Sequence, residues 1–175
     1  MKKIIIGILL FIIAVSSYFL IIAPQVNKMG SFATVNGVEI TASSYNLEIT
    51  KSQNFYKFQK LKAPDANIIQ QNVKEKLISE SLIVQYAQKH KITVADSELL
   101  GRYAETVEGF NKRNNILGVD DKMFLNKINE MYGTNKSDYL QTLKMDILKE
   151  KVQESVKLPL SAWLMEQKKT AQISK

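Results

Sequence analysis

The sequence contains no cysteine, one histidine, three prolines and seven glycines among its 175 residues. Without cysteine, the chain has no disulfide, no thiol nucleophile, no cysteine ligand for zinc and no attachment point for a lipoprotein's lipid. Proline and glycine are the residues that most often interrupt helices, so their scarcity favours long helices. The chain is also rich in Lys, Glu, Gln, Leu and Ile. This composition predicts a mainly α fold.

Sequence signatures of catalysis are also missing. The chain has no glycine-rich phosphate loop and no Gly-x-Ser-x-Gly, His-Glu-x-x-His or Ser-x-x-Lys pattern. We interpret the single histidine, His90, as a cation at the end of a helix, because it stands between lysines and has no second metal ligand nearby. We interpret the acidic pair Asp120 and Asp121 as a helix cap. The sequence therefore predicts no catalytic residue, no metal site and no cofactor.

The net charge of +7 is moderate, and Lys2, Lys3 and Lys28 account for three of it. No cluster of basic residues interleaved with aromatics is present, so we expect no nucleic-acid partner. A mixed-charge, solvated surface explains the remaining charge, and attraction to anionic lipid or cell-wall polymers is the alternative.

One long hydrophobic run opens the chain. Residues 4–23 contain no charged side chain and follow Lys2 and Lys3. A helix of this length spans the ~30 Å hydrocarbon layer of a bilayer, and the lysines favour a cytoplasmic N-terminus. We expect a cytoplasmic tail (1–3), a transmembrane signal-anchor (4–23), a linker (24–31) and an extracytoplasmic domain (32–175). The run is longer than the apolar region of most cleavable signal peptides and ends in Ala23-Pro24, which favours an uncleaved anchor. A cleaved signal peptide is the alternative.

The sequence of residues 32–175 predicts a hairpin followed by about six helices. Asn36-Gly37 is a two-residue hairpin signal within residues 32–40. Patterns of apolar spacing and capping residues then predict helices over about 41–61, 64–89, 93–110, 121–132, 135–157 and 160–169. The second of these is so apolar that we expect it to form the core. Ile173 alternates with polar neighbours, which predicts a short strand that joins the hairpin in a three-stranded sheet.

Aromatic and methionine side chains gather in two regions. Phe55, Tyr56 and Phe58 share one predicted helix. Core packing explains most such residues, and an exposed groove for varied apolar partners is the alternative. The second group is the predicted peptide-binding site, and it consists of Phe110, Met123, Phe124, Met131, Tyr132 and Tyr139.

The order of these segments resembles the N-terminal domain of the SurA, PrsA and PpiD type of extracytoplasmic foldase. The resemblance is carried by VNGVEIT (35–41), KEKLISESLIVQYAQKHKITVADSEL (74–99), MFLNKINEMYGTNKSDYLQTLKMDILKEKV (123–152) and WLMEQKKTAQI (163–173). It implies the helical chaperone domain of that family, in which a C-terminal strand returns to the N-terminal domain. Full-length members carry parvulin isomerase domains between the long helix and the C-terminal segment, whereas here residues 156–160 join the two directly. The resemblance therefore implies the chaperone part without isomerase activity.

These observations lead to two functional hypotheses. The first is an ATP-independent holdase on the bacterial cytoplasmic membrane, with its domain extracytoplasmic, that binds unfolded or nascent exported polypeptides. The second is a tethered adaptor that binds one defined envelope or secretion partner. The sequence leaves open whether the protein is a monomer or a homo-oligomer.

Overall fold

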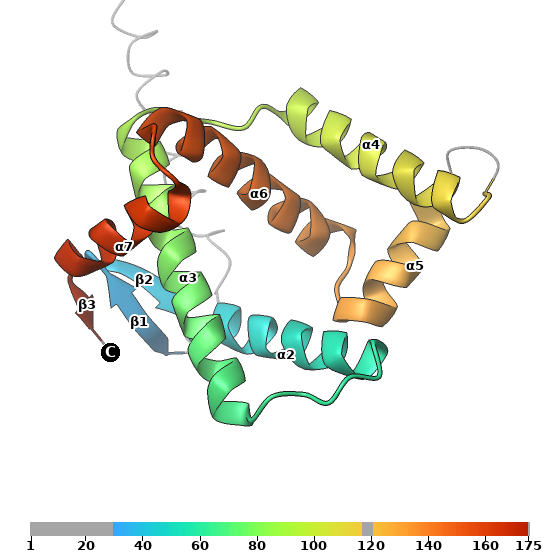
Figure 1. Ribbon diagram of the computed structural model, residues 1–175, viewed down its shortest axis with the longest axis horizontal. Coiled ribbons are helices and arrows are strands. Elements are labelled where there is room, and N and C mark those ends of the chain that lie inside the picture. The colour runs from blue at the N-terminus through green and yellow to red at the C-terminus, as the bar shows by residue number, and fades with distance from the viewer. Residues whose placement is uncertain (1–29, 117–120, 175) are drawn as a thin grey trace, which may run out of the picture. The chain divides into compact units, whose positions relative to one another are not determined.

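The computed structural model describes residues 30–116 and 121–174. Three strands and six helices lie in these two stretches (Figure 1). The strands are β1 (Ser31–Val35), β2 (Val38–Thr41) and β3 (Ile173–Ser174). The helices are α2 (Ala42–Phe58), α3 (Ala66–Lys89), α4 (Asp96–Arg113), α5 (Asp121–Tyr132), α6 (Lys136–Val156) and α7 (Leu160–Thr170). The predicted class, a mainly helical domain with a small sheet, is confirmed.

The predicted transmembrane segment, residues 4–23, lies outside the described residues, as do the tail before it and the linker up to residue 29. Among the helices of the described part, none is both long enough and apolar enough to cross a membrane.

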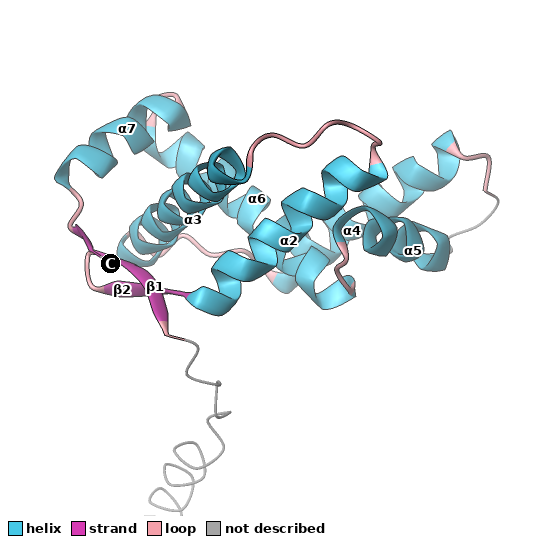
Figure 2. Cartoon of the chain, turned by 90° about the horizontal axis from the view of Figure 1, so that it is seen from below, coloured by secondary structure: helices cyan, strands magenta, loops and turns pink. Residues whose placement is uncertain are grey.

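The small sheet joins the two ends of the described chain. β1 and β2 form an antiparallel hairpin, and β3 pairs antiparallel with the other edge of β1, so the strand order is β2-β1-β3 (Figures 1 and 2). Asn36 and Gly37 at the hairpin turn have φ angles of 51° and 80°. Two consecutive positive φ angles are what a type I′ turn requires, and they explain the Asn-Gly sequence there. The three-stranded sheet predicted from residues 32–40 and Ile173 is confirmed.

Side-chain caps set the start of two helices where the sequence predicted them. The Thr41 Oγ1 accepts a hydrogen bond from the Ser44 backbone N–H at 3.1 Å, at the start of α2. The Asn135 Oδ1 accepts one from the Asp138 N–H at 3.0 Å, at the start of α6. In both helices a side-chain oxygen satisfies an N–H group that has no acceptor within the helix.

Two other helix starts differ from the prediction. Helix α4, predicted to start at about residue 93, begins at Asp96, and its N-cap, Ala95, makes no side-chain cap. The Thr93 carbonyl, before this start, accepts a hydrogen bond from the Lys151 Nζ of α6 at 2.8 Å. α3 begins at Ala66 rather than Pro64, and its N-cap, Asp65, has φ and ψ angles of −55° and 145° and makes no side-chain cap.

Helix α3 forms the centre of the core, as its apolar sequence predicted. Toward the sheet, Ile78 and Leu82 pack with Val35 and Ile40. Further along α3, Ile83 and Ala87 pack with buried side chains of α6 and α7, namely Val152 and Trp163. Burying an aliphatic side chain of this size contributes about 1.5–3 kcal/mol, so α3 holds the sheet, α6 and α7 together.

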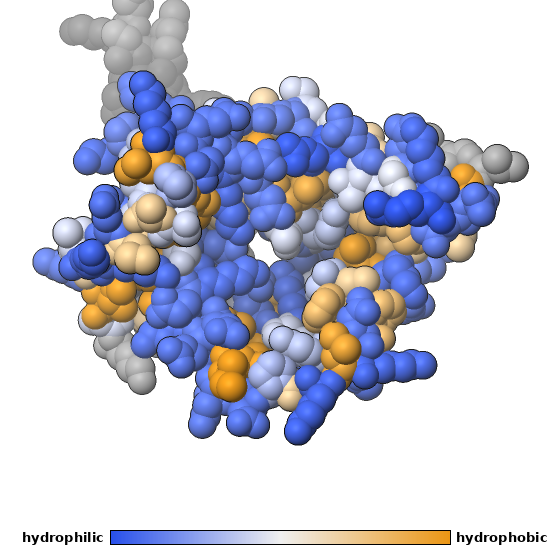
Figure 3. All heavy atoms as spheres, viewed as in Figure 1, coloured by the Kyte–Doolittle hydropathy of each residue, from blue (hydrophilic) through white to orange (hydrophobic). Residues whose placement is uncertain are grey.

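A third cluster lies away from the sheet. Tyr103 and Val107 of α4, Phe124 of α5 and Leu143 of α6 are buried together. In Figure 1, the helices α2, α3, α5 and α6 surround a central space. Side chains do not fill all of it, because the space-filling view in Figure 3 shows an opening in the middle of this face.

Candidate functional site

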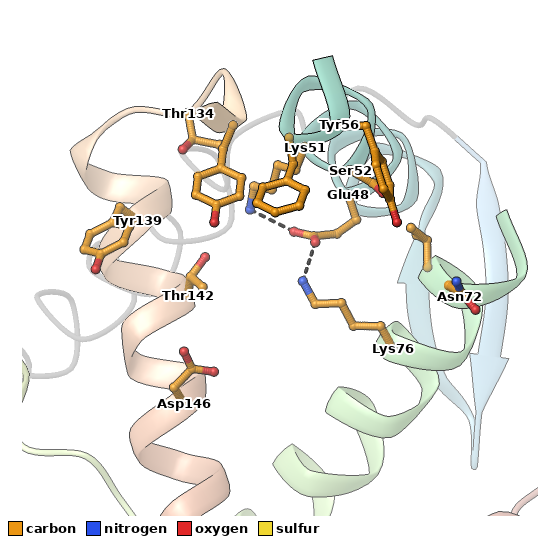
Figure 4. A pocket seen from close by; sticks show the side chains of 13 residues that line it. Glu48, Lys51, Ser52, Tyr56, Asn72, Lys76, Thr134, Tyr139, Thr142 and Asp146 are labelled. Atoms are coloured by element: carbon orange, nitrogen blue, oxygen red, sulfur yellow. Dashed lines mark hydrogen bonds and ion pairs between the residues drawn. The ribbon is translucent and has the colours of Figure 1, made fainter. Parts of the chain in front are cut away.

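A cavity of about 560 Å³, called here the central cavity, lies between α2, α3 and α6 (Figure 4). Side chains from segments far apart in the sequence form its walls. The lining residues are Glu48, Lys51, Ser52, Phe55 and Tyr56 of α2, Asn72, Val73 and Lys76 of α3, and Tyr132, Thr134, Tyr139, Thr142 and Asp146 from the end of α5 to the middle of α6.

Aromatic rings line the end of the central cavity near α5. The Phe55 and Tyr132 rings are nearly parallel, with centroids 6.0 Å apart, and the Tyr56 ring meets Phe55 edge-on at 5.8 Å. The Asn54 Nδ2 donates to the Tyr132 carbonyl at 3.3 Å, which ties the end of α5 to α2. The chain then turns at Gly133, whose φ angle of 68° suits glycine. These contacts place an aromatic surface beside open space.

A cluster of charges lies along the wall formed by α2 and α3. The Glu48 Oε1 accepts a hydrogen bond from the Lys51 Nζ at 2.8 Å, and its Oε2 accepts one from the Lys76 Nζ (Figure 4). The side chains of Glu48 and Lys51 are each only 15% exposed. Burial raises the pKa of the Glu48 carboxyl, but the two lysine hydrogen bonds outweigh burial, and the pKa lies below its usual value. Glu48 is therefore an anion at neutral pH.

A smaller cavity of about 300 Å³ borders the central cavity. Glu48, Lys51, Lys76 and Thr142 line both. The apolar side chains of Leu47, Leu77 and Met145 also line the smaller one. The charge cluster therefore lies where two hollows between α2, α3 and α6 meet.

The structure separates the six residues of the predicted peptide-binding site. Tyr132 and Tyr139 line the central cavity. Phe124 is only 4% exposed in the third core cluster, and the partly buried Phe110 packs against it edge-on with centroids 5.5 Å apart. Met123 is 53% exposed on the surface, and neither it nor the half-buried Met131 lines a described cavity. A role in peptide binding stays a prediction for all six.

Sequence reasoning grouped Phe55 and Tyr56 on one helix but did not assign them to the site. It missed the charged residues Glu48, Lys51 and Lys76 altogether. The spacing of Glu48 and Lys51, three residues apart on a helix, is common on solvated surfaces, and the partner Lys76 lies on another helix. The local sequence therefore carried no signal for this cluster.

His90 lies at the end of a helix, as predicted. It is exposed at the C-terminal cap of α3, and its ring stacks on Tyr86 at 4.1 Å. Within the described stretches, no three His, Asp or Glu side chains gather closely enough to hold a metal ion.

Comparison with known protein families matches residues 1–153 to the SurA-like N-terminal domain. The matched part includes β1, β2 and every residue that lines the central cavity. Only residues 157–159 separate α6 from α7, so no parvulin domain is inserted at that point. No curated protein matches the chain. Because the family match covers most of the sequence, the chain belongs to the SurA-like N-terminal domain family, a family of the chaperone type.

Proposed function

We propose that this protein is an ATP-independent holdase that binds extended, apolar segments of exported polypeptides in the central cavity. We also propose that residues 4–23 anchor it in the bacterial cytoplasmic membrane, with the described domain on the extracytoplasmic side. Membership of the non-catalytic, SurA-like N-terminal part of the chaperone family supports this function and gives no support to isomerase activity.

One observation carries the proposal: four aromatic rings line a cavity. Phe55, Tyr56, Tyr132 and Tyr139 lie around about 560 Å³ of space. Pockets that bind ligands usually enclose ~300–1,000 Å³ behind largely apolar walls. Such a surface shields a client's exposed apolar side chains without a fixed sequence, because aromatic rings make contacts that tolerate variation in their partner.

The holdase activity is tested by following light scattering as chemically denatured citrate synthase aggregates. The full-length chain is added in phosphatidylcholine nanodiscs, and empty nanodiscs are the control. We expect the chain to suppress scattering. No suppression at several-fold molar excess of the chain would contradict the holdase function.

Two matched variants locate the surface responsible. Phe55→Ala removes a ring from the central cavity, so we expect it to lose most of the suppression. Met123→Ala removes an exposed apolar side chain outside the described cavities, so we expect it to act like the unaltered chain. The opposite pattern would place the client surface on α5 and exclude the central cavity.

In-cell crosslinking separates the holdase from a tethered adaptor. A photoreactive amino acid is placed at Tyr56, in the wall of the cavity. A holdase gives crosslinks to many exported proteins, whereas an adaptor gives one dominant product.

Membrane anchoring and orientation need separate measurements. We expect the protein to stay in the membrane fraction after alkaline extraction. We also expect protease added to spheroplasts to degrade the described domain. Release by alkali would contradict the anchor, and protection from protease would contradict the orientation.

A further inference from the structure

We propose that the hydroxyl groups of Tyr56 and Tyr132 bind main-chain amide groups of the client segment that occupies the central cavity. The inference rests on the proposed function, because it concerns how the same cavity holds an extended polypeptide. It commits to one occupant, an extended segment that is held partly through its uncharged main chain.

The charged side chains around the central cavity already have partners. The Glu48 carboxylate pairs with Lys51 and Lys76. On the opposite wall, the Asp146 Oδ1 accepts a hydrogen bond from the Lys149 Nζ at 3.2 Å. The lining contains two lysines and two acidic residues, so its formal charges balance. A charged client group would lose its hydration and meet groups that are already paired, so the lining favours an uncharged occupant.

An extended client segment brings main-chain groups that need hydrogen-bond partners. Its N–H and C=O groups have no partners within the segment, unlike those of a helix. A main-chain group that leaves water without a new partner weakens binding. A cavity lined by carbon atoms alone would therefore hold such a segment poorly, whereas hydroxyl groups among the aromatic rings reduce this cost.

The tyrosines of the described stretches fall into two sets. In one set the hydroxyl group has a side-chain hydrogen-bond partner, and this set consists of Tyr86, Tyr103 and Tyr139. In the other set the hydroxyl group has no protein partner within these stretches, and this set consists of Tyr45, Tyr56 and Tyr132. Tyr56 and Tyr132 are half-buried and line the cavity. Because a tyrosine hydroxyl that leaves water usually finds a partner, these two groups point to a ligand.

Both hydroxyl groups belong to the aromatic surface around Phe55. The Phe55 ring contacts Tyr56 edge-on at 5.8 Å and lies nearly parallel to Tyr132 at 6.0 Å. Figure 4 shows the Tyr56 side chain pointing from α2 toward α3. A client ring packed against Phe55 therefore brings the main-chain groups beside it to these hydroxyl groups. A hydroxyl group can donate to a C=O or accept from an N–H, so this arrangement tolerates clients of different sequence.

The inference is tested with two uncharged peptides that have blocked ends and carry the same neutral fluorophore. One contains Ser-Gln-Phe-Gln-Ser, and the other has methyl groups on the main-chain nitrogens of both glutamines. Fluorescence anisotropy follows their binding to the full-length chain in phosphatidylcholine nanodiscs. We expect the methylated peptide to bind about fivefold more weakly, because it lacks both N–H donors beside the aromatic ring. Equal binding of the two peptides would overturn the inference.

Variants that remove a hydroxyl group and keep its ring identify the groups responsible. In the double variant Tyr56→Phe, Tyr132→Phe, we expect the unmethylated peptide to bind about fivefold more weakly and the difference between the peptides to disappear. Two controls should leave this difference unchanged. Tyr139→Phe removes a cavity hydroxyl group that already has Thr106 of α4 as its partner. Tyr45→Phe removes a hydroxyl group without a protein partner outside the central cavity.

The outcomes separate this inference from the proposed function. If neither peptide binds the unaltered chain, the proposed function fails. If both bind and the double variant keeps the full difference between them, the proposed function stands and the assignment of the two hydroxyl groups is wrong. A purely structural role of Tyr56 and Tyr132 would weaken both peptides by the same factor in the double variant, which would also overturn the assignment.

Discussion

The two ends of the helical domain differ in the side chains that dominate their packing. At the sheet end, α3 meets the strands and α6 mostly through aliphatic side chains such as Val35, Ile83 and Val152, and Trp163 of α7 is the buried aromatic residue. At the other end, α4 and α5 pack through aromatic rings: Phe124 meets Phe110 and Tyr139 edge-on, with centroids 5.5 Å and 5.2 Å apart. We call the first the sheet end and the second the aromatic end.

The central cavity lies where these two packings meet. Val73 and Lys76 come from α3, which the sheet end holds, whereas Tyr132 ends α5, which belongs to the aromatic end. Tyr139 takes part in both, because it lines the cavity and contacts Phe124. The comparison indicates that the sheet end supports the charged wall of the cavity and that the aromatic end positions the ring-lined wall.

Loss of Phe124 should have the largest effect and should act mainly at the aromatic end. Phe124→Ala removes a buried ring, which typically destabilises a protein by about 4 kcal/mol. Urea unfolding measures this loss. Hydrogen exchange should show lost protection in α4 and α5 while α3 stays protected. Equal loss of protection in all helices would contradict the division into two ends.

Loss of Ile83 should be somewhat smaller but should affect the whole domain. Ile83→Ala leaves a void in α3 at its contacts with α6 and α7, at a cost of about 3 kcal/mol. Because α3 also holds the sheet, we expect the strands, α3, α6 and α7 to lose protection together. Loss confined to α7 would show that α3 does not organise this end.

A substitution at Gly133 tests how the ring-lined wall is positioned. Gly133 has a φ of 68°, and a Cβ placed there would lie 2.5 Å from the Asn54 Nδ2. We expect Gly133→Ala to cost about 1–2 kcal/mol in thermal unfolding and to weaken peptide binding, because Tyr132 precedes this turn.

The matched control for this change is Gly109→Ala. Gly109 lies within α4, and a Cβ there would meet nothing within 4 Å. Alanine suits a helix interior better than glycine, so this variant should be more stable by about 0.5–1 kcal/mol. Destabilisation by both variants would mean that the effect at Gly133 is not specific to the turn.

The charge cluster should have the smallest effect, and it should depend on pH. The pKa of Glu48 in the folded protein lies below its usual value. Its ion pairs therefore stabilise the fold above the pKa of the unfolded chain, and this contribution disappears as pH falls through the lower, folded pKa. We expect Glu48→Gln to lower the free energy of unfolding at pH 7 by less than about 1 kcal/mol. We also expect the variant to lose less stability than the unaltered protein as the pH falls.

Chemical denaturation of both proteins from pH 7 to pH 3 checks this prediction. Parallel curves for the two proteins, with the same loss of stability in acid, would contradict the stabilising role of Glu48 in its ion pairs.

Local features of the fold were predictable because their causes lie within a few residues. Asn36-Gly37 specified its turn, and Thr41 and Asn135 capped their helices, since the donor and acceptor lie three residues apart. The start of α4 was predicted about three residues too early. The Thr93 carbonyl accepts a hydrogen bond from a lysine of α6 that lies 58 residues further along the chain, and the local sequence does not show this contact.

The candidate site was predicted only in part. The group chosen from sequence contained Tyr132 and Tyr139 of the central cavity, but also Phe124 of the core and the exposed Met123. All are apolar or aromatic side chains in one stretch of chain, so composition could not separate them. Their surroundings depend on which side of α5 and α6 faces α2, and helical periodicity does not contain that information.

The sequence by itself determined the helical class, the hairpin, the return of the last strand and the apolar centre at α3, because periodicity, turn chemistry and caps act locally. Only the tertiary structure decided where space remains between helices. It brought Glu48 and Lys51 of α2 to Lys76 of α3, and it placed Phe55 beside Tyr132. The sequence gives the chemical type of each side chain. Whether that side chain lies in the core, in solvent or beside a cavity depends on how distant segments pack.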